Sequence, residues 1–225
     1  MPKPSVTGHL QSEVTATRVM SMGAARTYST TVGSQSVDLP LVALTDELSI
    51  ALLICVDLGV HFAEVAGREL ADLMRPARPE IIVSVATMGI PLAIEASRAL
   101  GFDDYVILHK TPKIHLGETW AEPVNSITTE KPQRLRMDPA RVPAVRGHRV
   151  AVVDDVISTG ASTLAALRLV RRIGAEPVVI GTLMTEGSGW RKALGADADM
   201  VRSLGSMPLF RPAGDDSGEL AEDWD

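Results

Sequence analysis

From residue 80 onward, short runs of apolar residues alternate with segments in which apolar residues recur every three or four positions. Four segments are typical of strands buried on both faces: EIIVSVA, DYVILH, RVAVVDD and PVVIGTLM. The intervening segments IPLAIEASRALG and STLAALRLVRRIG have the periodicity of helices that end at a glycine, and WRKALG predicts a shorter helix. This alternation predicts a doubly wound α/β fold, a mainly parallel sheet with helices on both faces.

The first part of the chain has a different pattern. RTYSTTVG and SVDLPLVAL alternate apolar and polar residues and predict a hairpin that turns near Gly33. ELSIALLICVD predicts either a further strand or a short buried helix, and VHFAEVAGRELADLM predicts a helix that ends before RPARPE. This part is expected to form a small N-terminal hood beside the sheet.

The distribution of charge indicates a third unit of the chain, an acidic C-terminal tail. The chain of 225 residues has 22 basic and 28 acidic residues, a net charge of −6, and six of the acids lie in the last twelve residues. The rest is therefore balanced at 22 of each sign, and no basic block indicates nucleic acid or an anionic membrane as a partner. The expected units are an N-terminal segment and hood with one helix on the core (1–79), an α/β core (80–210) and an acidic, disordered tail (211–225).

Cys55 is the only cysteine and lies in the apolar run IALLICV, which predicts a buried structural thiol. The longest apolar run, residues 50–56, is too short to cross a bilayer. The N-terminal stretch MPKPSVTGHLQSEV has no apolar segment of the signal-peptide type. A cytoplasmic location with no membrane partner is therefore expected.

The segment VAVVDDVISTGAST, residues 150–163, combines a buried strand, two acids and a turn of small hydroxyl residues before a helix. Ligands of parallel sheets bind at the carboxyl ends of strands, where Asp154 and Asp155 are expected. The backbone N–H groups after them, at the start of a helix, suit a phosphate, and Gly160 allows close approach. Carboxylates would repel that phosphate, so they should face hydroxyl groups or a cation. A sugar phosphate fits this pattern, although an acidic turn with helix-capping hydroxyls is the plainer alternative.

This segment resembles the signature of type I phosphoribosyltransferases of the adenine/xanthine-like group, which bind 5-phosphoribosyl-1-pyrophosphate (PRPP). The resemblance implies that Asp154 and Asp155 contact the ribose hydroxyls. It also implies a 5-phosphate site made of Ser158, Thr159, Gly160, Ala161 and Ser162. Ala161 stands where many members have a second glycine.

Two further parts of the site follow from the resemblance. The family expects a pyrophosphate-binding turn after an earlier strand, here Ala86, Thr87, Met88 and Gly89, with backbone donors because the turn carries no charge. It also expects a basic loop over the reacting centre, which places Lys110 and Lys113 with the two aspartates as catalytic residues. The step Ser126-Ile127-Thr128 is similar to one in xanthine phosphoribosyltransferases.

The resemblance implies a Mg²⁺-dependent purine phosphoribosyltransferase of purine salvage, with the metal held mainly by PRPP and water and by no protein cage. Adenine is the first expectation for the base and xanthine the second, with hypoxanthine and guanine open. Glu118 and Glu186 are candidates to take the proton of the base, and Met207, Leu209 and Phe210 are candidates to wall its pocket. A homodimer is expected from the family.

Two alternatives stay open. One is a PRPP-sensing regulatory protein on the same fold that does not catalyse transfer. The other is a phosphoribosyltransferase for another base, such as orotate.

Overall fold

The computed structural model describes residues 26–111, 120–124, 133–213 and 219–225. Its central sheet has the strand order β10-β9-β8-β4-β5, and every pair of neighbours is parallel. The strands are β4 (Ile81–Val85), β5 (Tyr105–Leu108), β8 (Arg149–Ile157), β9 (Glu176–Glu186) and β10 (Val201–Met207). The predicted parallel α/β sheet is confirmed.

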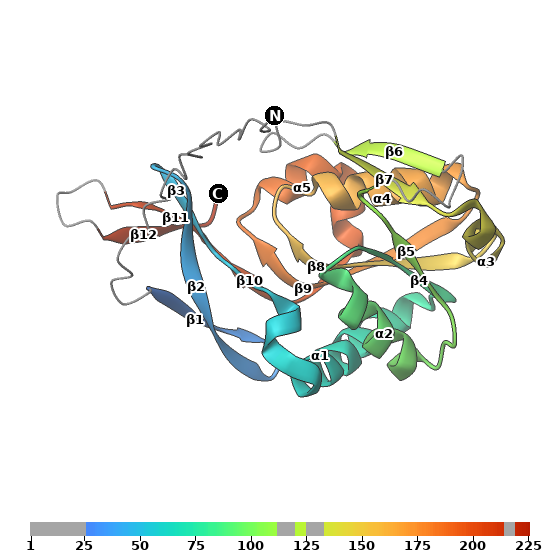
Figure 1. Ribbon diagram of the computed structural model, residues 1–225, viewed down its shortest axis with the longest axis horizontal. Helices are drawn as coiled ribbons and strands as arrows, with labels where there is room; N and C mark the ends of the chain where they lie inside the picture. Colours follow the sequence, from blue (N-terminus) through green and yellow to red (C-terminus); the bar gives the residue numbers. More distant parts are fainter. Residues whose placement is uncertain (1–25, 112–119, 125–132, 214–218) are drawn as a thin grey trace, which may run out of the picture.

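Helices cover this sheet on both faces (Figure 1). α1 (Gly59–Met74) and α2 (Gly89–Leu100) pack on one face, and α4 (Ala161–Arg172) and α5 (Gly189–Leu194) lie on the other. Gly101 ends α2 in the left-handed conformation, as the sequence predicts. The short helical segments are η1 (Cys55–Leu58), η2 (Arg75–Ala77), η4 (Pro139–Arg141), α3 (Val142–Val145) and η5 (Gly195–Met200).

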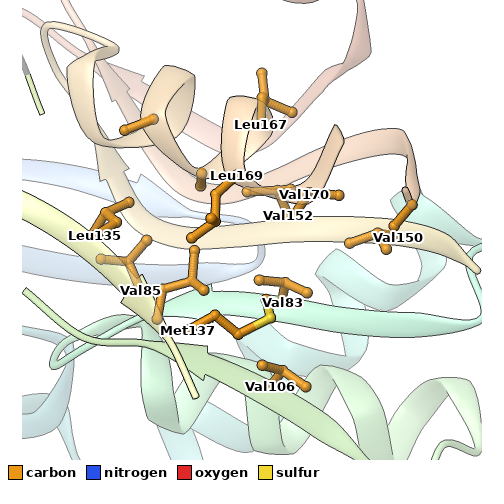
Figure 2. Close-up of a cluster of buried hydrophobic side chains, with 14 of the residues drawn as sticks. Val83, Val85, Val106, Leu135, Met137, Val150, Val152, Leu167, Leu169 and Val170 are labelled. Carbon is orange, nitrogen blue, oxygen red and sulfur yellow. The ribbon is translucent and has the colours of Figure 1, made fainter. Parts of the chain in front are cut away.

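The two faces of the sheet have separate apolar clusters because successive side chains of a strand point to opposite sides. Figure 2 shows the cluster under α4, where fully buried side chains of β4 and β8 meet the helix. Its members include Val83, Val85, Val150, Val152, Leu167, Leu169 and Val170. The alternate residues Ile82, Ala151 and Val153 belong to the cluster under α1 and α2. Buried on both faces, the strands read as continuous apolar runs.

The hood is an antiparallel sheet of order β1-β2-β3-β11-β12 at one end of the molecule (Figure 1). Its strands are β1 (Thr27–Val32), β2 (Gln35–Thr45), β3 (Leu48–Ala51), β11 (Leu209–Pro212) and β12 (Leu220–Asp223). The predicted hairpin β1–β2 is confirmed, with Gly33 at φ 59° in its turn. ELSIALLICVD contains both of its alternatives, the strand β3 followed by the helical turn η1.

The acidic tail differs from its prediction, because residues 220–223 form β12 rather than disordered chain. β12 pairs with β11, and Arg211 Nε lies 2.5 Å from Asp223 Oδ2. This ion pair lowers the pKa of Asp223, with the Asp225 backbone N–H adding to the effect. Glu222 and Asp223 therefore lie in a paired edge strand, with Arg211 beside Asp223.

A small antiparallel pair, β6 (Trp120–Val124) and β7 (Gln133–Met137), packs on α4. The segment RLRM lies in β7, and β6 forms a regular strand although it contains Pro123. The step Ser126-Ile127-Thr128 lies outside the described residues. No helix in the described ranges is long and apolar enough to span a bilayer.

Candidate active site

Asp154 and Asp155, which together form the DD motif, lie where β8 extends beyond its neighbour β4. β4 pairs with β8 only as far as Val153, whereas β9 stays paired with β8 through Ile157. The strand therefore continues past both acids, further than the sequence predicts, and ends immediately before Ser158. Asp154 and Asp155 are thus held by regular strand structure at the carboxyl end of the sheet, the expected place for a ligand.

Asp154 and Asp155 have unequal environments. Asp154 is 9% exposed, and its Oδ1 accepts a 3.0 Å hydrogen bond from the backbone N–H of Asp155. Burial raises the pKa of Asp154 well above its usual range, and the charge of Asp155 raises it further. Asp155 is half-buried, and its carbonyl oxygen accepts a 2.9 Å hydrogen bond from Thr182 Oγ1. The pair combines one buried carboxyl group with one that is partly exposed.

Lys110 is close enough to Asp154 for its charge to lower the pKa of that carboxyl, opposing the effect of burial. It follows β5, and its carbonyl oxygen accepts a 3.0 Å hydrogen bond from Arg136 Nη1 of β7. The structure therefore brings Lys110 to the acidic pair. Lys113 and Glu118, the other loop residues expected to act here, lie outside the described residues.

The loop that follows the acids leads directly into α4. Gly160 has φ 77°, and a Cβ atom there would lie 3.3 Å from both Ala193 Cβ and Trp190 O. The positive φ therefore favours glycine, and a Cβ atom at this position would press against α5. The N-cap residue Gly160 has no side chain to cap α4, and the N–H of Ala161, the first residue of the helix, donates a long 3.4 Å hydrogen bond to Thr159 Oγ1. The N-terminal end of a helix carries partial positive charge and unpaired N–H groups, so Ser158–Ser162 form a suitable anion site.

The turn between β4 and α2 lies beside the same aspartates. An ideal Cβ atom on Gly89 would be 3.4 Å from Asp154 Oδ1 and 2.4 Å from Ser84 Oγ. The peptide bond Ala86–Thr87 is cis. The structure thus brings residues 86–89, the expected pyrophosphate turn, next to the DD motif.

A cavity of about 560 Å³ opens between the hood and the core, next to Asp155. Its walls are mainly aliphatic, and its polar side chains come from β8, from the loop after it and from the end of β9. It is lined by Leu44, Leu48, Ile50, Ala51, Leu52, Leu53, Asp155, Val156, Ser158, Thr159, Glu186, Met207 and Leu209. Met207 and Leu209 are therefore wall residues, whereas Phe210 is buried and packs edge-on against Tyr28 with 5.2 Å between ring centroids.

Glu186 is the buried acid of this cavity, with 5% exposure. Burial raises the pKa of its carboxyl group, and a hydrogen bond with the Ser158 side chain partly offsets this rise. A carboxyl group in an aliphatic cavity is desolvated, so it binds strongly to any hydrogen-bond donor that enters. Of the two residues expected to take a proton, Glu186 is the one the structure describes.

Several contributors to the site were not found from the sequence. Thr182 and Arg136 act through backbone carbonyls of neighbouring segments, and Ser84 contacts the turn. Ser84 and Thr182 share one signal, a single hydroxyl inside an apolar strand, which has to find a partner when buried. The hood residues of the cavity carry no such signal.

Sequence comparison points to one family. Residues 61–207 match the phosphoribosyl transferase domain. A xanthine phosphoribosyltransferase of Laribacter hongkongensis is 28% identical over 64% of this chain and 76% of that protein. An orotate phosphoribosyltransferase of Caldanaerobacter subterraneus is 26% identical over 57% of this chain and 56% of that protein. The transcriptional regulator GfcR 1 of Methanosarcina barkeri is 29% identical over 60% of this chain and 55% of that protein.

Solved structures agree on the fold. Adenine phosphoribosyltransferase of Rhodothermus marinus superposes with a TM-score of 0.57 at 25% identity, over 68% of this chain and 83% of that one. The Giardia lamblia enzyme in complex with 9-deazaadenine superposes with a TM-score of 0.61 at 19% identity, over 75% of this chain and 93% of that one. With a family match over more than half of its residues, the chain belongs to the phosphoribosyl transferase domain family, that of the PRPP-dependent phosphoribosyltransferases.

Proposed function

We propose that this protein transfers the 5-phosphoribosyl group of PRPP to a purine base, with adenine as the first expectation and xanthine as the second. The products are a purine nucleoside monophosphate and pyrophosphate. The observation that carries the proposal is the position of the aliphatic cavity. It begins at Asp155, Ser158 and Thr159, so a flat base in it would adjoin a ribose held by the DD motif.

Each part of the site binds a different group of PRPP. The loop Ser158–Ser162 at the N-terminus of α4 binds the 5-phosphate, since its donors and the helix dipole favour an anion. Asp154 and Asp155 accept hydrogen bonds from the ribose hydroxyls. The turn of residues 86–89 binds the pyrophosphate through backbone donors. These three groups fix C1 of the ribose in front of the cavity, which supplies proximity and orientation.

Charge develops on the ribose ring as the bond to pyrophosphate breaks. Carboxylates at Asp154 and Asp155 stabilise positive charge on the ring, and Lys110 stabilises negative charge on the leaving group. The aliphatic walls contributed by the hood exclude water, which would otherwise attack C1. A nitrogen of the base in the cavity then forms the new bond to C1.

The residues present suit Mg²⁺, the ion that the family uses with PRPP. Burial and the charge of Asp155 make ionisation of Asp154 unfavourable, and a cation close to the pair would reverse this. When bound, Mg²⁺ neutralises charge on the pyrophosphate. Asp154 and Asp155 are the residues that would contact it, directly or through water.

Glu186 is the proposed acceptor of the proton that the base loses. It lies in the cavity and is buried, and its raised pKa makes it a better proton acceptor than an exposed glutamate. A carboxylate also accepts hydrogen bonds from N–H groups of a purine.

Pyrophosphate release tests the proposal. The protein is incubated with PRPP, Mg²⁺ and one base at a time: adenine, xanthine, hypoxanthine, guanine or orotate. Release is expected with a purine, and Asp154→Asn together with Asp155→Asn is expected to lower the rate at least about a hundredfold.

The chain contains a matched control in its other described Asp-Asp pair. Asp103 and Asp104 are exposed and precede β5, at the opposite end of the sheet. The variant Asp103→Asn with Asp104→Asn removes the same two charges, so it should keep full activity. Equal losses in the two double variants, or release with orotate alone, would contradict the proposal.

The second candidate is a PRPP-sensing regulator, which the similarity to a transcriptional regulator favours. Such a protein would bind PRPP without releasing pyrophosphate for any base. It would also bind DNA at low salt with an affinity that falls as salt rises. A homodimer, expected from the family, is tested separately by the molar mass of the protein in solution.

A further inference from the structure

Two buried side chains hold the carbonyl groups of the turn between β4 and α2. Cys55 Sγ donates a 2.8 Å hydrogen bond to Met88 O, and Ser84 Oγ donates a 3.0 Å hydrogen bond to Gly89 O. Cys55 is 3% exposed and Ser84 is fully buried. Two successive carbonyl oxygens of an uncharged turn are thus occupied by donors from inside the protein.

The thiol of Cys55 is suited to act as a permanent donor. Burial raises its pKa to about 12, and the charges of Asp155 and Asp154 add to the rise. The sulfur therefore keeps its proton at neutral pH. The Ser84 hydroxyl likewise has one proton to donate, and Gly89 O is its acceptor.

Because a peptide bond is planar, each of these two contacts also fixes the direction of a backbone N–H group. In a trans peptide the C=O of one residue and the N–H of the next point in opposite directions. Both Met88–Gly89 and Gly89–Ile90 are trans. Met88 C=O turned toward Cys55 therefore directs the Gly89 N–H away from Cys55. Gly89 C=O turned toward Ser84 fixes the next peptide in the same way, and the N–H of that peptide, which belongs to Ile90, donates to Thr87 O across the turn.

The N–H groups of the turn itself are left available. Among the hydrogen bonds of the described residues, none is donated by the N–H of Thr87, Met88 or Gly89. The neighbouring donors are used internally, since Ala86 N–H binds Leu108 O and Ile90 N–H binds Thr87 O. A turn with three unpaired N–H groups beside a carboxylate pair needs its backbone held firmly, because charged side chains contribute nothing there.

We propose that Cys55 and Ser84 are positioning residues for pyrophosphate binding: Cys55 directs the N–H of Gly89, and Ser84 holds the Gly89–Ile90 peptide, whose N–H closes the turn on Thr87 O. The proposal rests on the proposed function, since it assumes that this turn binds the pyrophosphate of PRPP. Neither side chain is expected to touch the substrate. Cys55 also begins η1, two residues after the cavity residue Leu53, so it links the base pocket of the hood to the turn.

Binding of the separate halves of the substrate tests this role without any turnover. The probes are pyrophosphate with Mg²⁺ and, separately, ribose 5-phosphate, each titrated into the full chain by calorimetry. Cys55→Ala and Ser84→Ala should each raise the Kd for pyrophosphate about tenfold, the effect of losing one buried hydrogen bond. The Kd for ribose 5-phosphate should stay within about twofold, since its site is the loop before α4.

Two further variants separate positioning from packing. Cys55→Ser keeps a donor of nearly the same shape and should restore most of the pyrophosphate affinity that Cys55→Ala loses. Ser97→Ala is the matched control, because Ser97 is a buried serine of α2 whose hydroxyl has no hydrogen-bond partner. It should change neither Kd. Melting curves establish that each variant is folded at the temperature of the titration.

The outcomes distinguish this inference from the proposed function. Wild-type pyrophosphate affinity in Cys55→Ala and Ser84→Ala overturns the inference while transfer activity stands. An equal loss for pyrophosphate and ribose 5-phosphate also overturns it, as does a wild-type protein that does not bind pyrophosphate. If pyrophosphate binding depends on both side chains but no base is used, the inference stands and the proposed transfer fails.

Discussion

Gly89 faces Asp154 across the site, and a Cβ atom on Gly89 would lie 3.4 Å from Oδ1 of Asp154. The first residue of α2 and the buried acid of the DD motif therefore share one small space. Ser84 Oγ closes it on the other side, 2.4 Å from the same Cβ position. Any side chain at residue 89 has to displace a group on which the proposed chemistry depends.

Gly89→Ala is accordingly expected to raise the KM for PRPP about tenfold or more, because the methyl group displaces Ser84 and shifts the turn. Overpacking should also lower the free energy of unfolding by about 1–3 kcal/mol. The measurements are steady-state kinetics and thermal unfolding. Gly189→Ala is the control, since Gly189 is the first residue of α5 and has open space around it. A KM that changes equally in both variants would argue against the close contact.

Asp154→Asn is expected to stabilise the unliganded protein in a pH-dependent way. The pKa of Asp154 is raised in the folded state, mainly by burial, so the folded protein holds this proton at pH values where the unfolded chain has released it. Wild-type stability therefore falls as the pH rises from the usual range of aspartate through the raised pKa. Asparagine does not titrate, so the variant escapes this loss.

Thermal unfolding between pH 4 and pH 8 measures the effect. The difference in Tm between Asp154→Asn and the wild type should grow with pH and reach about 2–4 °C, the shift that 1 kcal/mol produces in a protein of this size. Asp103→Asn is the control, because the Asp103 side chain is exposed and removed from the site. A difference that is constant over this range would show that the carboxyl group is not desolvated.

Gly160→Ala tests the 5-phosphate loop against a second glycine near the same helix. Both Gly160, at φ 77°, and Gly174, at φ 84°, adopt the left-handed conformation, so alanine should cost each about 1–2 kcal/mol of stability. Only Gly160 lies in the proposed anion site, and its Cβ would meet α5 at 3.3 Å. The Kd for ribose 5-phosphate should rise about tenfold in Gly160→Ala and stay unchanged in Gly174→Ala. Equal affinities in the two variants would place the phosphate elsewhere.

The core could be predicted from the sequence because its signals are local. Each parallel strand is an apolar run, each helix has its own period, and Gly101 marks the end of α2. The DD motif and the loop after it are also contiguous, so one segment of fourteen residues predicts their neighbourhood. The strand itself runs further than expected, because pairing with β9 continues to Ile157 after β4 has ended.

The hood and the cavity depend on contacts between distant segments, which no local pattern predicts. β3 pairs with β11 some 160 residues later, through Ile50 opposite Leu209. The tail was expected to be disordered because its acids dominate its composition. β12 forms there because it pairs with β11, and Asp223 has Arg211 beside it. Composition carries no information about such a partner.

The same limit applies within the site. The sequence indicates that Cys55 is buried, and it is, but nothing near residue 55 shows that its thiol contacts Met88. Thr182 supports the backbone of Asp155 from the neighbouring strand, which is known only once the register of β8 and β9 is known. Motifs therefore predict which residues face the substrate, whereas the residues that hold them in place emerge from the fold.

Glu186→Gln tests the proposed proton acceptor. Its carboxyl group has a raised pKa, mainly through burial, and it accepts a proton only when ionised. The wild-type kcat/KM for the base should therefore fall as the pH decreases through this raised pKa, at a higher pH than an ordinary glutamate would give. Glutamine keeps the shape but cannot take the proton, so kcat should fall about 10²- to 10⁴-fold and this acid limb should disappear.

Asp154 also has a raised pKa, so an acid limb that persists in Glu186→Gln would assign the titration to the ribose site and remove Glu186 from the chemistry. Binding of PRPP, measured without the base, should be unchanged.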